Sequence, residues 1–235
     1  MDNILVLGDS HTYGDGLKDV GYEKPWEQHS VSTWPYHMFK KENIKNLSYP
    51  GCSNDMIFLR LVRYATKKDK VLIMFSYPER LHCTKKGLNF NVSHSFISAI
   101  SDDYRENLIG EQIADKSKIT SLINYFDDDL LEILFLKNIL SCQTFCQSKN
   151  IKYYFTMVDF RKERRMGESL TLYRKGLHDS IDWNNIFLIN EKYGFLNYAS
   201  LVKAQHGLDG NHWNEDYHKT FGKLFLDWIN KKKVL

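Results

Sequence analysis

The sequence of 235 residues predicts an α/β fold of three layers, in which a parallel sheet lies between two layers of helices. Several short apolar runs have no polar alternation, which is typical of strands that are buried on both faces. Longer segments with helical periodicity lie between these runs. Strands and helices that alternate along a chain favour a doubly wound sheet, so we expect an α/β/α sandwich.

The strands are expected where apolar and β-branched residues run together between turn residues. The first run, Ile4 to Leu7, is followed at once by Gly8-Asp9-Ser10. Its uninterrupted apolar character favours a central position in the sheet. The other expected strands cover residues 44–49, 70–75, 151–158 and, with a weaker pattern, 185–190.

Four segments carry the periodicity of helices, and they cover residues 32–42, 54–66, 130–148 and 214–231. In the second segment, the spacing predicts that Ile57, Leu61 and Tyr64 share one face. In the third, Cys142 and Cys146 lie four residues apart and are expected to share a buried face.

The length predicts a single domain over residues 1–235 with one insertion. Residues 82–126 break the alternation of strands and helices, and they are polar with clusters of Ser and Asp. Two interpretations stay open. The insertion forms a cap or one wall of a binding site, or it is a surface excursion without a role.

Composition and charge restrict the partners. The formal net charge is +3, from 32 basic and 29 acidic residues, which gives no basis for a nucleic-acid partner. No apolar stretch reaches the roughly 20 residues of a membrane span. The N-terminus lacks the basic leader of a signal peptide, so a cytoplasmic location is expected. No oligomeric state is predicted.

Ser10 is the first candidate for chemistry. In a doubly wound sheet the ligand crevice lies outside the carboxyl ends of the strands, where Ser10 is expected. A serine hydroxyl becomes a good nucleophile when an imidazole accepts its proton and a carboxylate orients that imidazole. Asp209 and His212 lie three residues apart in a Gly-rich turn before the last helix, so they complete a candidate catalytic triad.

These stretches resemble the signature blocks of the SGNH, or GDSL, hydrolases. GDSHTYG (8–14) resembles the first block, whose serine is the nucleophile, and DGNH (209–212) resembles the last, Asp-x-x-His. YPGCSND (49–55) looks like the second block, whose glycine donates a backbone N–H to the oxyanion hole. The resemblance implies a flavodoxin-like sheet, oxyanion donors at Ser10 and Gly51, and no cofactor.

One block departs from the family pattern. The family places Gly-x-Asn-Asp after the third strand, and its asparagine side chain is an oxyanion donor. Here that strand continues into FSYPER (75–80), which contains no asparagine. We expect Asn54 to be the third donor, with Ser76 and Arg80 as alternatives from the third loop. Asn54 could equally be the N-cap of the second helix.

The combined features predict a serine esterase or acylhydrolase that works through an acyl-enzyme. The expected substrate is a small-molecule or glycan ester, such as an O-acyl group on a carbohydrate or metabolite. One alternative is a non-catalytic carbohydrate- or ester-binding module on the same fold. Another is a metal-dependent hydrolase, although the candidate ligands lack the helical His-x-x-x-His spacing. Those candidate ligands are His11, His206, Asp209, His212 and His218.

Overall fold

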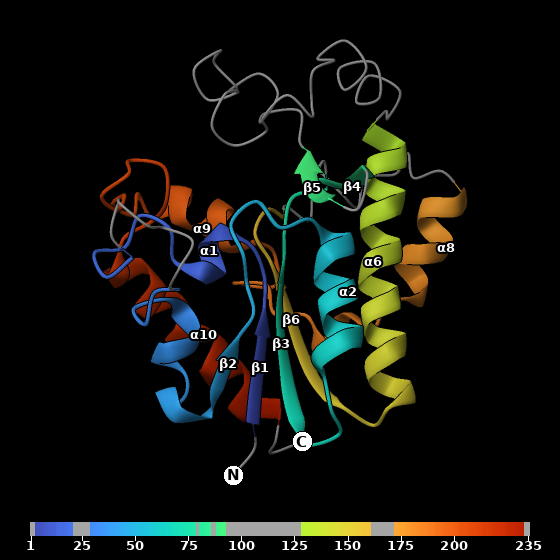
Figure 1. The fold of residues 1–235 in the computed structure, drawn as a ribbon, viewed down its shortest axis with the longest axis horizontal. Helices are drawn as coiled ribbons and strands as arrows, with labels where there is room; N and C mark the ends of the chain where they lie inside the picture. The colour runs from blue at the N-terminus through green and yellow to red at the C-terminus, as the bar shows by residue number, and fades with distance from the viewer. Residues whose placement is uncertain are drawn as a thin grey trace.

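A computed structural model describes residues 3–20, 29–78, 80–85, 88–92, 128–160 and 172–232. Its main sheet contains four parallel strands in the order β2-β1-β3-β6, with helices on both faces (Figure 1). The strands are β1 (Asn3–Leu7), β2 (Ile44–Asn46), β3 (Asp69–Phe75) and β6 (Lys152–Met157). The strand order reverses beside β1, so the predicted doubly wound, three-layer architecture is confirmed.

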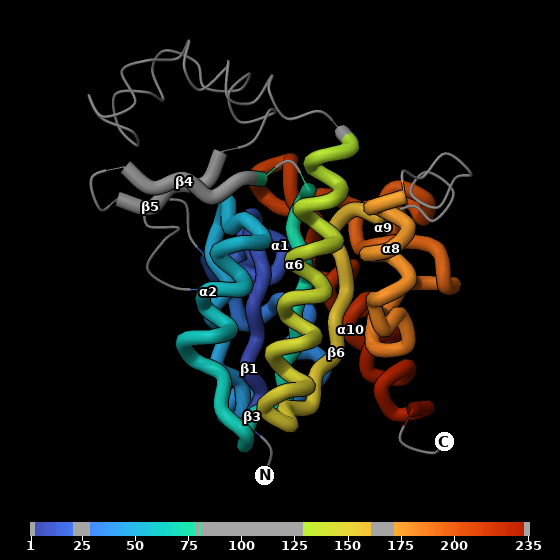
Figure 2. Tube along the Cα trace, turned by 90° about the vertical axis from the view of Figure 1, so that its right-hand side faces the viewer, coloured from blue at the N-terminus to red at the C-terminus, as the bar shows by residue number. Residues whose placement is uncertain are grey.

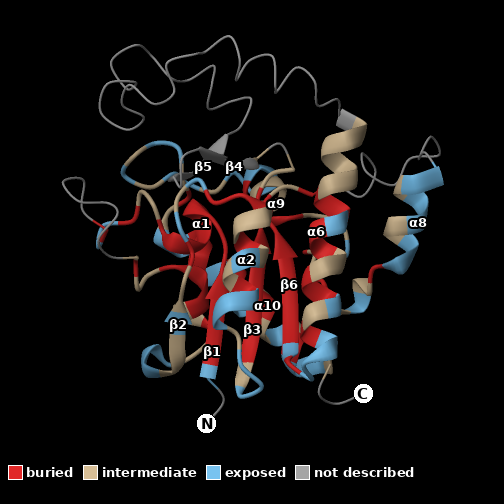
Figure 3. Ribbon diagram, turned by 45° about the vertical axis from the view of Figure 1, so that its right-hand side comes forward, coloured by how far each residue is buried: buried red, intermediate tan, exposed pale blue. Residues whose placement is uncertain are grey.

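The central strands are buried on both faces, as Figure 3 shows. Successive side chains of a strand point to opposite sides of the sheet. Leu5 and Leu7 therefore join one hydrophobic cluster, and Ile4 and Val6 join the other. This explains why β1 is an unbroken apolar run in the sequence.

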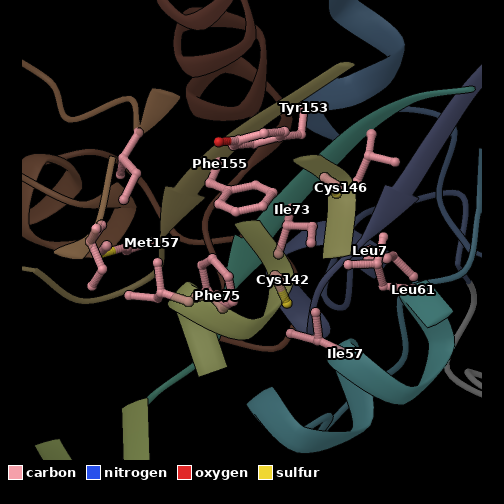
Figure 4. Close-up of a cluster of buried hydrophobic side chains, with 14 of the residues drawn as sticks. Leu7, Ile57, Leu61, Ile73, Phe75, Cys142, Cys146, Tyr153, Phe155 and Met157 are labelled. Carbon is pink, nitrogen blue, oxygen red and sulfur yellow. The ribbon is translucent and has the colours of Figure 1, made fainter. Parts of the chain in front are cut away.

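The first helical layer consists of α2 (Asn54–Tyr64) and α6 (Asp128–Ser148), and α8 (Leu172–Ser180) packs against the outside of α6 (Figure 2). Cys142 and Cys146 are fully buried in this layer, which confirms their shared face (Figure 4). Ile57 and Leu61 are fully buried as well. Tyr64, the last residue of α2, is 37% exposed and its ring faces the Lys45 ammonium group.

The second layer consists of α10 (Glu215–Lys232), α9 (Phe195–Leu201) and a 3₁₀ turn, η1 (Trp34–His37). The predicted helix over residues 32–42 is wrong. The segment instead forms two short 3₁₀ turns, the second being η2 (Lys41–Asn43). Tertiary packing determines this shape, because a Cβ atom on Gly222 would lie 2.7 Å from the Trp34 carbonyl oxygen. The turn is thus fitted to the surface of α10.

The predicted fifth strand over 185–190 is also wrong. Ile186 forms a single parallel bridge with Phe155, after the 3₁₀ turn η4 (Trp183–Asn185). Asn190 and Glu191 have positive φ angles and turn the chain back, so the pairing does not continue.

Part of the predicted insertion is a two-stranded antiparallel hairpin of β4 (Leu81–Lys85) and β5 (Leu88–Val92). Residues 93–126 lie outside the described residues, so the role of the insertion as a cap stays a prediction. Within the described parts of the chain, no helix is long and apolar enough to cross a membrane.

Candidate active site

The serine lies where β1 ends and the short helix α1 (Ser10–Tyr13) begins. Asp9 caps this helix, because its Oδ1 accepts a hydrogen bond from the His11 N–H at 3.1 Å. Gly14 ends the helix in the left-handed conformation, with φ of 95°. Ser10 is held on this single turn at the carboxyl edge of the sheet and is only 4% exposed.

Asp9 also fixes the loop after β1 to the loop after β3. Its carboxylate is fully buried, and its Oδ2 accepts from the Ser76 hydroxyl and from Arg80 Nη1, each at 2.9 Å. Arg80 Nη1 donates to Ser76 Oγ at the same distance. A buried carboxylate needs such partners. The network therefore immobilises the backbone that carries Ser10.

The second half of the site is the turn between α9 and α10. The Gly207 N–H donates to the His212 carbonyl at 2.6 Å and closes this turn. Asp209 Oδ1 accepts from the N–H groups of Asn211 and His212, both at 3.0 Å. Gly16 makes room for it, because a Cβ atom there would lie 2.5 Å from Asp209 Oδ1.

The three residues of the candidate triad lie together, although they come from opposite ends of the chain. His212 Nδ1 is 2.5 Å from Asp209 Oδ2, and His212 Nε2 is 3.0 Å from Ser10 Oγ. The carboxylate can only accept, so Nδ1 carries the proton and Nε2 is left to accept from the serine hydroxyl. This is the geometry of a nucleophile, its general base and an orienting carboxylate.

The electrostatics of the triad are consistent with these roles. Burial alone would raise the pKa of Asp209, but hydrogen bonds from the backbone and ring of His212 outweigh it and lower that pKa. Asp209 is therefore ionised at neutral pH.

Two further titratable groups lie beside the triad. The His11 ring centroid is 4.8 Å from that of His212, and burial, with the charges of His212 and Arg80, lowers the pKa of His11 well below its usual value. His11 is therefore neutral. Burial raises the pKa of Asp15 to about 6. No motif in the sequence marks Asp15, and His11 is predicted only as a candidate metal ligand.

Ser10 and Gly51 are the expected backbone donors of an oxyanion hole. Gly51 has a φ angle of 71°, a conformation that favours glycine, and it is exposed. Among the described residues, neither the Ser10 N–H nor the Gly51 N–H donates to a protein acceptor. Both are thus available to an oxyanion, and their role stays a prediction.

Asn54 has a different set of partners. Its Nδ2 donates to the carbonyls of Ser76 and Tyr77 at 3.3 and 3.2 Å, and its Oδ1 accepts from the Ser76 N–H at 2.8 Å. The side chain thus connects α2 to the loop after β3. The N-cap interpretation of Asn54 is wrong, since Ser53 caps α2 through the Met56 N–H. Donation by Asn54 to an oxyanion stays a prediction.

The remaining histidines of the metal hypothesis have protein contacts. The His206 ring stacks on Trp213 with centroids 4.3 Å apart, and His218 Nδ1 accepts from the Trp34 N–H at 3.3 Å. In the described ranges, no cluster of three or more His, Cys, Asp or Glu residues could hold a metal ion.

Searches of known proteins found likeness only among solved structures. No family model and no curated protein matches the sequence. An esterase from Pseudoalteromonas sp., EstA, has 13% identity and a TM-score of 0.49, with full coverage of both chains. The lipase/acylhydrolase from Enterococcus faecalis has 15% identity and a TM-score of 0.48, covering 99% of this chain and 97% of its own.

A third structure is a putative lipolytic protein of the G-D-S-L family from Desulfitobacterium hafniense. It has 10% identity and a TM-score of 0.41, and the alignment covers 97% of this chain and 99% of that one. All three are described as esterases, lipases or lipolytic proteins.

Proposed function

We propose that this chain is a serine ester hydrolase that works through an acyl-enzyme. The observation that carries the proposal is the continuous contact from Asp209 Oδ2 through His212 to Ser10 Oγ, over distances of 2.5 and 3.0 Å. A surface histidine has no need of both contacts, whereas a general base needs one to orient its ring and one to receive the proton.

In the proposed reaction, Ser10 Oγ attacks the carbonyl carbon of an ester while His212 Nε2 takes the hydroxyl proton. Asp209 stabilises the imidazolium that forms. The N–H groups of Ser10 and Gly51 donate to the tetrahedral oxyanion. His212 then gives the proton to the leaving alcohol. Water, activated by the same imidazole, releases the acid from Ser10.

The substrate is proposed to be a small-molecule or glycan ester. A series of p-nitrophenyl esters with increasing acyl length would define the size of the acyl site. Ester hydrolysis that persists with a chelator present would separate this mechanism from the metal-dependent alternative.

The first prediction concerns Ser10. A fluorophosphonate should label the wild-type protein covalently, because it traps activated serines, and Ser10→Ala should lose both the label and ester hydrolysis. Asp209→Asn should lower turnover by about 10⁴-fold, because the histidine loses the partner that fixes its tautomer.

Ser200→Ala is a matched control, since Ser200 is an exposed serine of α9 whose hydroxyl bonds the Leu196 carbonyl. It should keep both label and activity. Near wild-type turnover in a folded Ser10→Ala variant would contradict the mechanism. A wild-type protein that neither labels nor hydrolyses any ester would favour the binding-module alternative.

A further inference from the structure

The amino edge of the sheet, at the opposite end of the strands from the candidate triad, carries a dense group of lysines. Four segments meet there. Residues 40–45, 66–70 and 149–152 lead into β2, β3 and β6, and residues 231–232 end α10. They lie at the lower end of the molecule in Figure 1. We call these four segments the basic edge.

The charge of the basic edge is opposite to that of the rest of the chain. The edge contains ten lysines and two acidic residues, Glu42 and Asp69, so its formal net charge is +8. Because the whole chain has a net charge of +3, all the other residues together carry −5. A chain with nearly balanced charge is thus strongly polarised along the direction of its strands.

The lysines of the basic edge are exposed, and their charges are not neutralised by the protein. All of them except Lys70 and Lys232 are exposed, and none of these eight forms an ion pair with another described residue. Asp69 is occupied in its own turn, because its Oδ2 accepts from the N–H and the hydroxyl of Thr66 at 2.6 and 2.8 Å. Like charges gathered in this way repel each other, so a partner of opposite charge would stabilise them.

The register of the sheet makes this edge level. Ile4 lies beside both Ile44 and Lys70, and Lys70 lies beside Lys152. The four strands therefore begin within one residue of each other, which corresponds to about 3.3 Å along the strands. An array of lysines at one height fits a planar surface, whereas a nucleic-acid duplex would meet it only along a line.

The residue types at the edge indicate the chemistry of the partner. Its basic side chains are all lysines, which attract phosphate groups as compact point charges, whereas arginine is the usual residue for bidentate recognition of one specific group. Tyr64 ends α2 at this edge, is 37% exposed, and has the Lys45 ammonium group 5.0 Å from its ring centroid. Tyrosine is enriched where a membrane meets water. Together these features match a surface of anionic lipid headgroups.

We propose that the basic edge docks this protein on the surface of a membrane that contains anionic lipids. Each lysine that comes within a Debye length of such a surface is attracted to it. The acidic remainder of the chain is repelled, so the protein docks in one orientation. The candidate triad, at the other end of the strands, then faces the water. Docking requires no catalytic activity, so this inference stands independently of the proposed function.

The test is cosedimentation of the full chain with large lipid vesicles. The wild-type protein should bind vesicles that contain about one third phosphatidylglycerol, and should not bind vesicles of phosphatidylcholine alone. Binding should be lost as the NaCl concentration rises from about 0.05 to about 0.5 M, because salt screens the attraction. Lys67→Glu combined with Lys68→Glu should lower the partition coefficient by at least about 30-fold.

The matched control combines Lys175→Glu in α8 with Lys219→Glu in the first half of α10. Both lysines are exposed and lie outside the basic edge, so the net charge changes equally while the edge stays intact. This variant should lose less than about 3-fold in partition coefficient. Thermal melts check that the variants are folded, and Lys149→Glu combined with Lys152→Glu replaces the first pair should that variant not fold.

Three outcomes would overturn the proposal. One is absence of wild-type binding to the anionic vesicles at low salt. Another is an equal loss of binding in the edge variant and the control, which would mean that net charge and not the basic edge determines binding. The third is stronger binding to duplex DNA of random sequence than to the vesicles at equal phosphate concentration, which would assign the edge to a nucleic acid.

Discussion

Asp209 holds His212 through both of its oxygens: Oδ1 accepts the backbone N–H and Oδ2 accepts from the ring. The rotation of the imidazole is therefore set by the position of one carboxylate. That carboxylate is in turn packed against Gly16, which has a φ angle of 78°. A glycine with no chemistry of its own thus controls the alignment of the proposed catalytic base.

Gly16→Ala tests this control. The new methyl group would meet Asp209 Oδ1 at 2.5 Å, so the turn must shift. Since a misplacement of about 1 Å can cost on the order of 100-fold in rate, we expect kcat to fall by about 10- to 100-fold. Steady-state kinetics and thermal melts on the purified variant give the measurement.

Gly176→Ala is the matched control, because Gly176 lies in α8 and its added methyl group would meet open space. This variant should keep wild-type kcat and gain up to about 1 kcal/mol in stability from helix propensity. Unchanged kcat in a folded Gly16→Ala variant would show that the turn does not depend on this contact.

Single residues also show what the sequence could predict. The close approach of Ser10, Asp209 and His212 was predictable because each stands in a short motif at a recognisable place in the fold. The environment of Asp15 was not predictable, because the absence of a donor to its Oδ1 among the described residues is visible only once its surroundings are known. The contacts of Asn54 join residues 22 and 23 positions apart, and no local pattern encodes them.

Among the elements, α2 and β3 are joined by the Asn54 side chain, which spans the loops on the carboxyl side of the sheet. Ser76, at the end of β3, is bound by Asn54 on its backbone and by Asp9 and Arg80 on its hydroxyl. The loops after β1 and β3 and the start of α2 therefore form one connected polar network.

Asn54→Ala should act mainly on stability. It leaves the N–H and the carbonyl of Ser76 without the Asn54 partner, while the Tyr77 carbonyl keeps the Arg80 N–H. Unpaired buried groups cost about 1–3 kcal/mol. We expect the free energy of unfolding to fall by about that amount, with kcat reduced by less than about 10-fold. Urea unfolding and kinetics on one preparation measure both quantities. A loss of about 100-fold in kcat at unchanged stability would instead assign Asn54 to the oxyanion hole.

The two elements that were wrongly predicted from the sequence depend on long-range packing. Residues 32–42 have the periodicity of a helix, yet contact with α10 at Gly222 imposes short 3₁₀ turns. Residues 185–190 have the composition of a strand, yet the turn at Asn190 limits the pairing with β6 to one bridge, and Ile189 pairs instead with Tyr193 across that turn. The central strands were predictable because a strand that is buried on both faces has apolar residues at nearly every position.

For the whole molecule, Asp15 and Asp209 link stability to pH in opposite directions. The pKa of Asp15 is raised to about 6 in the folded state, so its ionisation destabilises the fold progressively as the pH rises from about 4 to above 6. The pKa of Asp209 is lowered, so its contribution is present above its unfolded value and is lost as the pH falls through its folded value.

Asp15→Leu should therefore be more stable than the wild-type protein at pH 7 by up to about 3 kcal/mol, and this gain should disappear near pH 4. Urea unfolding at intervals between pH 4 and pH 7 measures the difference. A gain that stays constant over this range would mean that packing, and not the charge of Asp15, determines the effect.

The contact between Ser10 and His212 joins residues 202 positions apart in the sequence. Contacts of such separation form late, because the intervening chain must be ordered before they can close. A refolding intermediate with a complete sheet but an undocked α10 would contain the serine without its base. It would be compact yet chemically inert. Under the proposed function, ester hydrolysis thus reports the final docking step, and during renaturation it should return after the far-ultraviolet circular dichroism signal of the sheet.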